Sequence, residues 1–241
     1  MCSIDHTYQS FYTSDDVGET TWIDLSYMQE LFTENPQTDL QQSYVYYEKW
    51  MKIRTDDINF IIDTVISEIE DSNESKVYKS VDIERIGVMG HSLGGSAALG
   101  IGRMRNDIRA VIALESPFMN DIEGIKDSQF VFTDKIYPVP LLNVYSDSSW
   151  SILGDRPQYA ANYALLTTDV TSVFNVHISG VGHLALTDFA LSSPLLTRIL
   201  DRQDTTEERT IYALKTINKV CLEFFNSYLK ETGDFVSDGS Y

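Results

Sequence analysis

The chain has 241 residues, of which 43% are hydrophobic and 22% are charged, so it can bury a sizeable core and does not have the composition of a disordered protein. The chain has 18 Lys and Arg residues and 36 Asp and Glu residues, which gives a net charge of −18 at pH 7. A surface of that sign repels phosphate backbones, so we expect no nucleic-acid partner and no attraction to anionic membranes.

Residues 1–6 lack the basic and apolar regions of a signal peptide, and no apolar run approaches about 18 residues. The chain as written is therefore expected to be cytoplasmic, without an integral membrane segment. Cys2 and Cys221 stand near opposite ends, and no Cys/His cluster accompanies them. This pattern predicts two ordinary thiols and neither a zinc site nor a disulfide framework.

Short runs rich in β-branched and apolar residues alternate with longer segments along the chain. The runs predict strands at residues 2–6, 85–89, 110–114, 141–146 and 173–179. Strands that alternate with helices imply a parallel sheet with right-handed crossovers. No linker or repeat divides the chain, so we predict a single α/β domain over residues 1–241.

Two helices are predicted from apolar residues that recur at three- and four-residue steps. The first spans residues 44–69, and Arg54 is the only polar interruption of its apolar stripe. The second follows a predicted capping box at residues 205–208 and ends before Gly233. Residues 8–31 show no clear period, so we expect an irregular excursion over the surface there.

The predicted strand at residues 85–89 runs directly into the sequence Gly90-His91-Ser92-Leu93-Gly94 and then into a helix rich in small residues. A G-x-S-x-G sequence at a strand-to-helix turn is typical of a nucleophile elbow, in which a strained serine stands above the carboxyl edge of the sheet. Glycines at 90 and 94 are expected to let the strand and the helix approach each other. We predict Ser92 as the nucleophile and the amide of Leu93 as an oxyanion donor.

A serine nucleophile requires a base, and the chain contains four histidines. His91 occupies the variable position of the motif and is expected to point away from the Ser92 hydroxyl. His6 and His177 lie in predicted strands, which favours structural, hydrogen-bonded roles. His183 follows the last predicted strand, where the chain order of serine, acid and histidine puts the base, so we predict it as the general base.

The third member of such a triad is a carboxylate that accepts the other ring N–H of the histidine. It should lie at the carboxyl end of a strand between Ser92 and His183. Glu115 follows the predicted strand at residues 110–114, and Asp147 follows the one at residues 141–146. Periodicity does not separate these two positions.

The combined pattern resembles the platelet-activating-factor acetylhydrolase family, a branch of the α/β-hydrolases close to dienelactone hydrolases and bacterial polyester hydrolases. The likeness covers nearly the whole chain. Residues 3–6 resemble the family's fourth strand and residues 86–95 its elbow. Residues 113–115 resemble its acid-bearing strand end, and residues 182–183 with 187–189 resemble its histidine loop. The resemblance implies an α/β-hydrolase fold, a mostly parallel sheet with helices on both faces. It also implies Glu115 as the acid, although many other α/β-hydrolases place the acid one strand later, at Asp147.

The family hydrolyses esters of short or oxidised acyl chains without a metal or cofactor. The resemblance therefore implies carboxylic ester hydrolysis through an acyl-enzyme on Ser92, with a small-molecule or lipid-like ester as substrate. Phe118, Met119, Trp150 and Phe189 follow the predicted catalytic positions and are candidates for an acyl pocket. Alternatives are a polyester hydrolase or acyltransferase with the same triad, and a catalytically silent hydrolase-like domain that binds a partner.

Members of the family have about three strands before the one at which this chain begins, and a His-Gly loop supplies their second oxyanion amide. No such loop precedes Ser3, so the fold is expected to be amino-terminally truncated. The chain is also expected to be a poor catalyst, because the loss of one oxyanion donor costs about 10²- to 10³-fold in rate. The strand at residues 2–6 should be unpaired on one side or press against residues 85–89, and a homodimer could cover that edge. With an upstream segment, secretion or membrane association would be expected instead.

Overall fold

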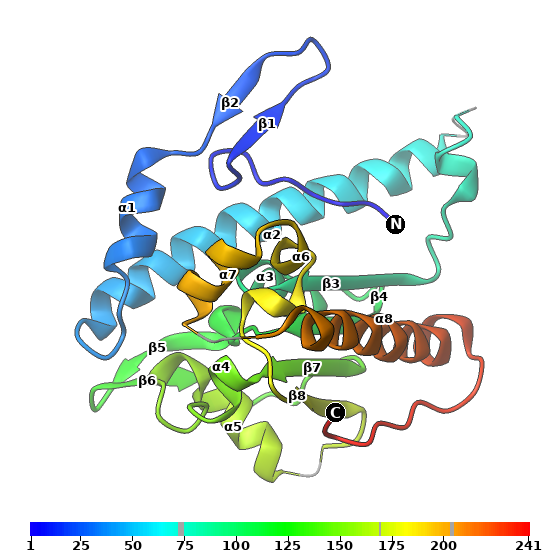
Figure 1. Ribbon diagram of the computed structural model, residues 1–241. Helices are drawn as coiled ribbons and strands as arrows, with labels where there is room; N and C mark the ends of the chain where they lie inside the picture. The colour runs from blue at the N-terminus through cyan, green and yellow to red at the C-terminus, as the bar shows by residue number, and fades with distance from the viewer. Residues whose placement is uncertain (72–74, 169, 203–204) are drawn as a thin grey trace.

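A four-stranded parallel sheet forms the centre of the computed structural model, which describes residues 1–71, 75–168, 170–202 and 205–241 (Figure 1). The strand order is β3-β4-β7-β8, and all three pairings are parallel. The bounds are Ile86–His91 for β3, Ile108–Leu114 for β4, Leu141–Ser146 for β7 and Val173–Ile178 for β8. The prediction of a parallel sheet and four of its five predicted strands are confirmed.

Helices cover both faces of the sheet because the strands bury apolar side chains on both sides. On β4, Val111 and Ala113 belong to the core cluster that α2 (Leu40–Glu70) and α3 (Leu93–Met104) complete. Their neighbours Ala110 and Ile112 belong to a second cluster, which α8 (Glu207–Lys230) closes. Figure 1 shows α2 and α8 on opposite sides of the strands, which confirms the predicted layers.

The first predicted helix is confirmed as α2 and is slightly longer than its apolar stripe. It begins after Asp39, whose side chain accepts a hydrogen bond from the Gln42 amide at 2.9 Å and so satisfies a free donor of the first turn. Arg54, the polar interruption of the stripe, donates to the Tyr27 hydroxyl at 3.2 Å. This contact lets a charged side chain sit beside the core.

The last predicted helix is confirmed as α8, with both ends shifted. The N-cap is Thr206, which accepts from the Arg209 amide, so the predicted capping box at residues 205–208 is wrong by one residue. The left-handed residue that ends the helix is Glu231, with φ 54°, although Gly233 was expected to end it. The amides of Glu231 and Thr232 both donate to the Asn226 carbonyl, so a hydrogen-bonded closure replaces the glycine signal.

The prediction of a strand at residues 2–6 is wrong. This segment has no strand partner, and within the described residues β3 pairs only with β4 and forms the edge of the sheet. His6 Nδ1 lies 2.9 Å from Asp57 on α2, and Ile4 packs against the first core cluster. Side-chain contacts with a helix therefore hold the segment, instead of a β-ladder.

Residues 8–31 are more regular than predicted. Two short strands, β1 (Tyr12–Ser14) and β2 (Thr20–Trp22), form an antiparallel hairpin that projects beyond α2 in Figure 1. Helix α1 (Leu25–Thr33) follows, with Asp24 as its N-cap. These strands are three residues long, which is too short for an alternating pattern to be recognised.

The remaining strands and α-helices lie between β4 and β7, between β7 and β8, and between β8 and α8. They are β5 (Ile122–Lys126), β6 (Gln129–Phe132), α4 (Asp147–Trp150), α5 (Ala160–Thr167), α6 (Phe189–Ser192) and α7 (Pro194–Asp201), and the chain also has a few single 3₁₀ turns. Strands β5 and β6 pair as an antiparallel hairpin apart from the central sheet. In the described part of the chain, every helix is too short or too polar to cross a membrane.

Candidate active site

Ser92 stands at the turn between β3 and α3, in a backbone conformation that few non-glycine residues adopt (φ 55°, ψ −125°). Its amide donates to the Leu114 carbonyl of β4 at 2.8 Å, which ties the turn to the neighbouring strand. A Cβ atom at Gly90 would lie 2.3 Å from the Gly94 backbone, so only glycine fits there. Leu93 is the first residue of α3, and its amide belongs to the helix N-terminus.

Gly94 does not have the packing role predicted for it. A Cβ atom at Gly94 would meet no atom within 4 Å, whereas one at Gly95 would lie 1.9 Å from the Ser116 Oγ and 2.7 Å from the Gly90 carbonyl oxygen. Gly90 and Gly95 are thus the pair that lets strand and helix approach. The motif alone indicates Gly94 because the helix geometry behind the turn is not visible in the sequence.

Glu115 follows β4 directly and also has a positive φ, 54°. Only 1% of the residue is exposed. Its amide donates to the Val144 carbonyl at 2.8 Å, and its Oε1 accepts a hydrogen bond from the Ser146 amide. The carboxylate is therefore anchored at the carboxyl edge of the sheet, one strand away from Ser92.

The structure brings His183 to this carboxylate. The His183 Nδ1 lies 3.5 Å from the Glu115 Oε2, which is an ion-pair distance but long for a hydrogen bond. The imidazole is 32% exposed, whereas the carboxylate is 1% exposed. Because Nδ1 faces Glu115, Nε2 is the ring nitrogen left for a reacting group.

Asp147, the other candidate acid, has a different histidine as its partner. Its Oδ1 lies 2.7 Å from the His177 Nε2, and its Oδ2 accepts from the Gly180 amide at 2.8 Å. Trp150 stacks on the His177 ring with centroids 4.7 Å apart and planes at 4°. These contacts agree with a structural, hydrogen-bonded role for His177.

His91 contacts His183, and sequence analysis assigned it no such role. Its Nε2 lies 3.0 Å from the His183 carbonyl oxygen, and the two ring centroids are 4.4 Å apart. Burial, together with the nearby His183, lowers the pKa of His91 to about 4, so the ring is neutral at pH 7. The only sequence signal for this contact is the variable position of the G-x-S-x-G motif.

The main chain of the histidine loop has further partners. The His183 amide donates to the Ser148 Oγ at 3.0 Å, and the Leu184 amide donates to the Asp201 carboxylate at 3.1 and 3.0 Å. Burial raises the pKa of Asp201. No motif marks Ser148 or Asp201, because neither contact follows from spacing along the chain.

Ser92 and His183 come together less directly than Glu115 and His183. In the parts of the chain that the structure describes, no hydrogen bond joins the Ser92 Oγ to the His183 ring. His91 connects the two residues indirectly, because it precedes Ser92 in the chain and its side chain contacts His183. Hydrogen bonds between catalytic groups are often long in unliganded enzymes and shorten when substrate binds.

The residues expected to line an acyl pocket are distributed differently. Phe118 is 1% exposed and packs edge to face with Tyr137 in the core, and Trp150 covers His177. Met119 packs against the first core cluster. Phe189 is half-buried at the start of α6, close in sequence to His183, and stays a candidate.

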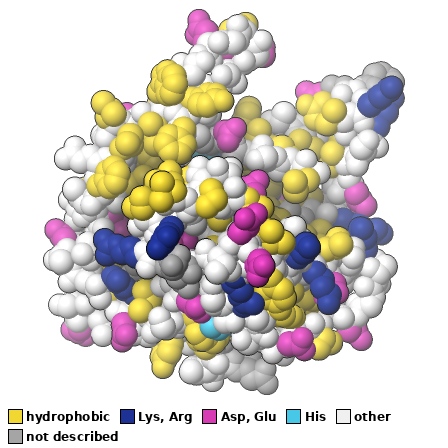
Figure 2. Space-filling view, viewed as in Figure 1, with side chains coloured by type: hydrophobic (Ala, Val, Ile, Leu, Met, Phe, Trp, Pro, Cys, Tyr) yellow, Lys and Arg dark blue, Asp and Glu magenta, His cyan; other side chains and the backbone are white. Residues whose placement is uncertain are grey.

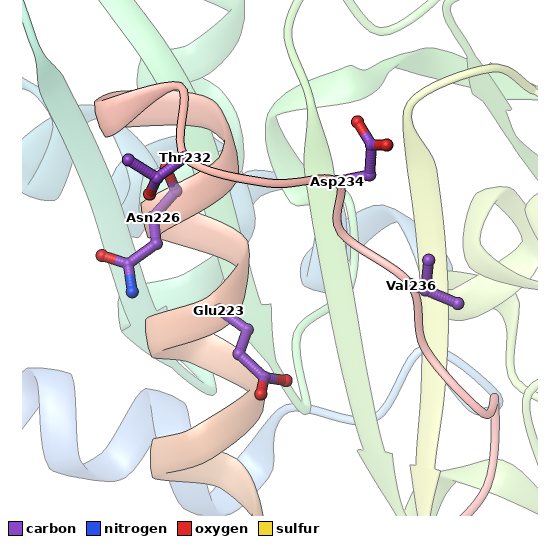
Figure 3. Close-up of a pocket in the computed structure, with 5 residues that line it drawn as sticks. All are labelled: Glu223, Asn226, Thr232, Asp234 and Val236. Atoms are coloured by element: carbon purple, nitrogen blue, oxygen red, sulfur yellow. The ribbon is translucent and has the colours of Figure 1, made fainter.

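Two surface cavities lie apart from these residues. One, of about 330 Å³, lies between α8 and the C-terminal tail (Figure 3), and its lining residues are Glu223, Asn226, Thr232, Asp234 and Val236. The other, of about 780 Å³, is lined by residues 9–14 together with Asp5, Ile23 and Leu31. Neither lining includes Ser92, Glu115 or His183.

Comparisons with known proteins bear on the fold and on part of the site. A family model described as PET hydrolase-like matches residues 42–131, which include Ser92 and Glu115 but not His183. A ferulic acid esterase from Streptomyces cinnamoneus is similar in structure, with a TM-score of 0.61 and 17% sequence identity. The match covers 95% of this chain and 59% of the esterase chain. No curated protein matches the sequence.

The chain therefore has the α/β-hydrolase fold, and it spans about three fifths of the length of that esterase. The parallel sheet, with helices on both faces and an elbow at the end of β3, agrees with this assignment. At 17% identity the likeness concerns the fold alone.

Proposed function

We propose that this chain is a serine hydrolase that cleaves carboxylic esters through an acyl-enzyme on Ser92. The observation that carries the proposal is the pair of strained residues on adjacent strands. Ser92 and Glu115 both have positive φ at strand ends, and Glu115 contacts the imidazole of His183. Strained backbone costs about 1 to 3 kcal/mol per residue and clusters at functional sites.

In the proposed reaction, the Ser92 Oγ forms a bond to the carbonyl carbon of the ester while its proton passes to the His183 Nε2. The alcohol then leaves with that proton, and an acyl group stays on Ser92. Water adds to this acyl group in the same way and releases the carboxylic acid. Glu115 stabilises the imidazolium in both steps because it is buried beside Nδ1.

The Leu93 amide is the oxyanion donor that the elbow supplies in this proposal. The elbow contributes this one donor, and removal of one donor from an oxyanion hole costs about 10²- to 10³-fold in kcat. We therefore expect turnover of a short ester below about 10 per second, the median for enzymes. A higher turnover would mean that another amide completes the oxyanion hole.

An apolar ester is the substrate class we favour. Large hydrophobic side chains gather over α1 and α7 in Figure 2, and α7 ends at Asp201, which contacts the histidine loop. Helix α7 carries four apolar side chains that are between 45% and 72% exposed: Leu195, Leu196, Ile199 and Leu200. A short or oxidised acyl ester of a lipid-like alcohol fits such surroundings.

A polyester is the second candidate substrate, because the PET hydrolase-like family model matches the part of the chain that holds Ser92 and Glu115. Acyl transfer would use the same residues with another acceptor. Release of soluble acid from a polyester film, compared with hydrolysis of a short p-nitrophenyl ester, distinguishes the two substrate classes. A silent binding domain would catalyse neither reaction.

A fluorophosphonate probe tests the proposed nucleophile. We expect the probe to label the parent protein and Ser3→Ala, a control at an exposed serine, but not Ser92→Ala. Hydrolysis of p-nitrophenyl butyrate should follow the same pattern. Labelling of Ser92→Ala, or an unchanged rate in that variant, would show that the nucleophile lies elsewhere.

A further inference from the structure

One peptide group in the histidine loop is hydrogen-bonded at both of its polar atoms. The peptide joins His183 to Leu184, and its carbonyl oxygen lies 3.0 Å from the His91 Nε2. The N–H of the same peptide donates to both oxygens of Asp201, at 3.1 and 3.0 Å. A peptide held at its donor and at its acceptor cannot rotate about the chain axis without breaking one of the two bonds.

His91 is well placed for the first of these contacts. It is the last residue of β3 and directly precedes Ser92, so the elbow that carries the serine also reaches the histidine loop. The ring is neutral at pH 7 because burial lowers the pKa of His91 to about 4. A neutral imidazole has one N–H, and the carbonyl partner places that proton on Nε2.

Asp201 reaches the loop because residue 182 is a glycine. A Cβ atom at Gly182 would lie 2.4 Å from the Asp201 Oδ2. Asp201 is the last residue of α7, so its carboxylate comes from an element that packs beside the loop. A hydrogen bond to a carboxylate is stronger than one between neutral groups, so the Asp201 contact is stronger than the His91 contact.

We propose that His91 and Asp201 are positioning residues that hold the 183–184 peptide and thereby set the distance between the His183 imidazole and Ser92. This inference rests on the proposed function, since it assigns the two residues a part in that reaction. Glu115 contacts the ring of His183 and orients it, whereas the peptide contacts fix where the loop stands. Neither His91 nor Asp201 touches a reacting atom.

The kinetic test compares His91→Phe, which keeps an aromatic ring but lacks the donor, with Asp201→Ala and Asp201→Asn. We expect kcat to fall about 100-fold in His91→Phe and Asp201→Ala, with KM within about twofold, because a small displacement of a catalytic group can cost that much. Asp201→Asn should recover most of the rate, since its amide oxygen still accepts the Leu184 N–H. The double variant, His91→Phe with Asp201→Ala, should have a kcat only slightly below that of either single variant, because both residues act on one peptide.

Asp155→Ala, at an exposed acidic residue, is the matched control and should keep the parent kcat. Thermal unfolding of every variant shows whether a fall in kcat comes from a displaced His183 or from an unfolded protein. If His91→Phe does not fold, the pair Asp201→Ala and Asp201→Asn decides the matter. Equal kcat in the parent, folded His91→Phe and folded Asp201→Ala would overturn the proposal, as would no recovery in Asp201→Asn.

A second readout does not depend on ester hydrolysis. With ¹⁵N-labelled histidine, the ring resonances of His183 should shift or broaden in His91→Phe and in Asp201→Ala, and return toward the parent values in Asp201→Asn. Unchanged His183 resonances in both disruptive variants would overturn the positioning role. If the parent protein cleaves no ester and takes up no fluorophosphonate, the proposed function fails, and these spectra still decide whether the contacts hold the loop.

Discussion

Asp147 and His177 form a close pair, with the carboxylate Oδ1 2.7 Å from the imidazole Nε2. The backbone of His177 also binds the C-terminal tail: its amide donates to the Gly239 carbonyl, and its carbonyl accepts from the Tyr241 amide, both at 2.9 Å. The Asp147–His177 pair therefore braces the end of β8 where the tail is attached. The His177 Nε2, the nitrogen at which a general base would accept the serine proton, is therefore already occupied by the Asp147 carboxylate.

The two carboxylates should differ sharply in their effect on catalysis. Glu115→Gln removes the charge beside the His183 Nδ1, and loss of a triad carboxylate costs about 10⁴-fold in kcat. Asp147→Asn should leave kcat within about threefold, because its partner is His177. Steady-state hydrolysis of a short ester measures both. Collapse of the rate in Asp147→Asn with a normal rate in Glu115→Gln would reverse the assignment.

The histidines should separate in the same way. His183→Gln is expected to abolish ester hydrolysis, because the variant lacks the imidazole that accepts the Ser92 proton. His177→Gln should retain activity and should loosen the C-terminal tail, which hydrogen exchange of the Tyr241 amide would report. An inactive His177→Gln together with an active His183→Gln would identify the other histidine as the base.

The two glycines of the G-x-S-x-G motif should respond differently to alanine. At Gly90 a Cβ would lie 2.3 Å from the Gly94 backbone, so Gly90→Ala should lower the free energy of unfolding by about 3 kcal/mol or more and distort the elbow. At Gly94 nothing lies within 4 Å, so Gly94→Ala should fold with nearly the parent stability. Urea unfolding compares the two variants, and equal losses would contradict this account.

Acid should destabilise the fold partly through His91. The pKa of His91 is about 4 in the folded chain and near 6.5 when unfolded, so the unfolded state binds more protons between these values. Stability therefore falls as pH falls from about 6.5 to 4, by about 3 kcal/mol in total. Burial lowers the pKa of His6 as well, which acts in the same direction.

Urea unfolding at pH 7.5 and 4.5 tests this prediction against the background of the carboxylates. His91→Phe has no titrating ring at this position, so its loss of stability between the two pH values should be smaller than that of the parent. Equal losses in the two proteins would show that His91 does not contribute.

The local sequence determined the elements and the positions of the chemical groups. Apolar runs of five to seven residues identified the sheet strands, and the G-x-S-x-G sequence after one of them placed Ser92 at a strand-to-helix turn. These features depend on residues close together in the chain, where steric limits and side-chain periodicity act directly. The strand predicted at residues 2–6 failed because a strand also needs a neighbour to pair with, and β3 pairs only with β4 among the described residues.

Only the tertiary structure decided which groups meet. Glu115 and Asp147 look alike in the sequence, each a carboxylate after an apolar strand, yet one faces His183 and the other His177. The contacts of His91 and Asp201 with the histidine loop join residues that lie far apart in the chain or have no motif. Such contacts depend on the order of the strands and on how helices pack against them, and neither property is encoded in the spacing of residues along the chain.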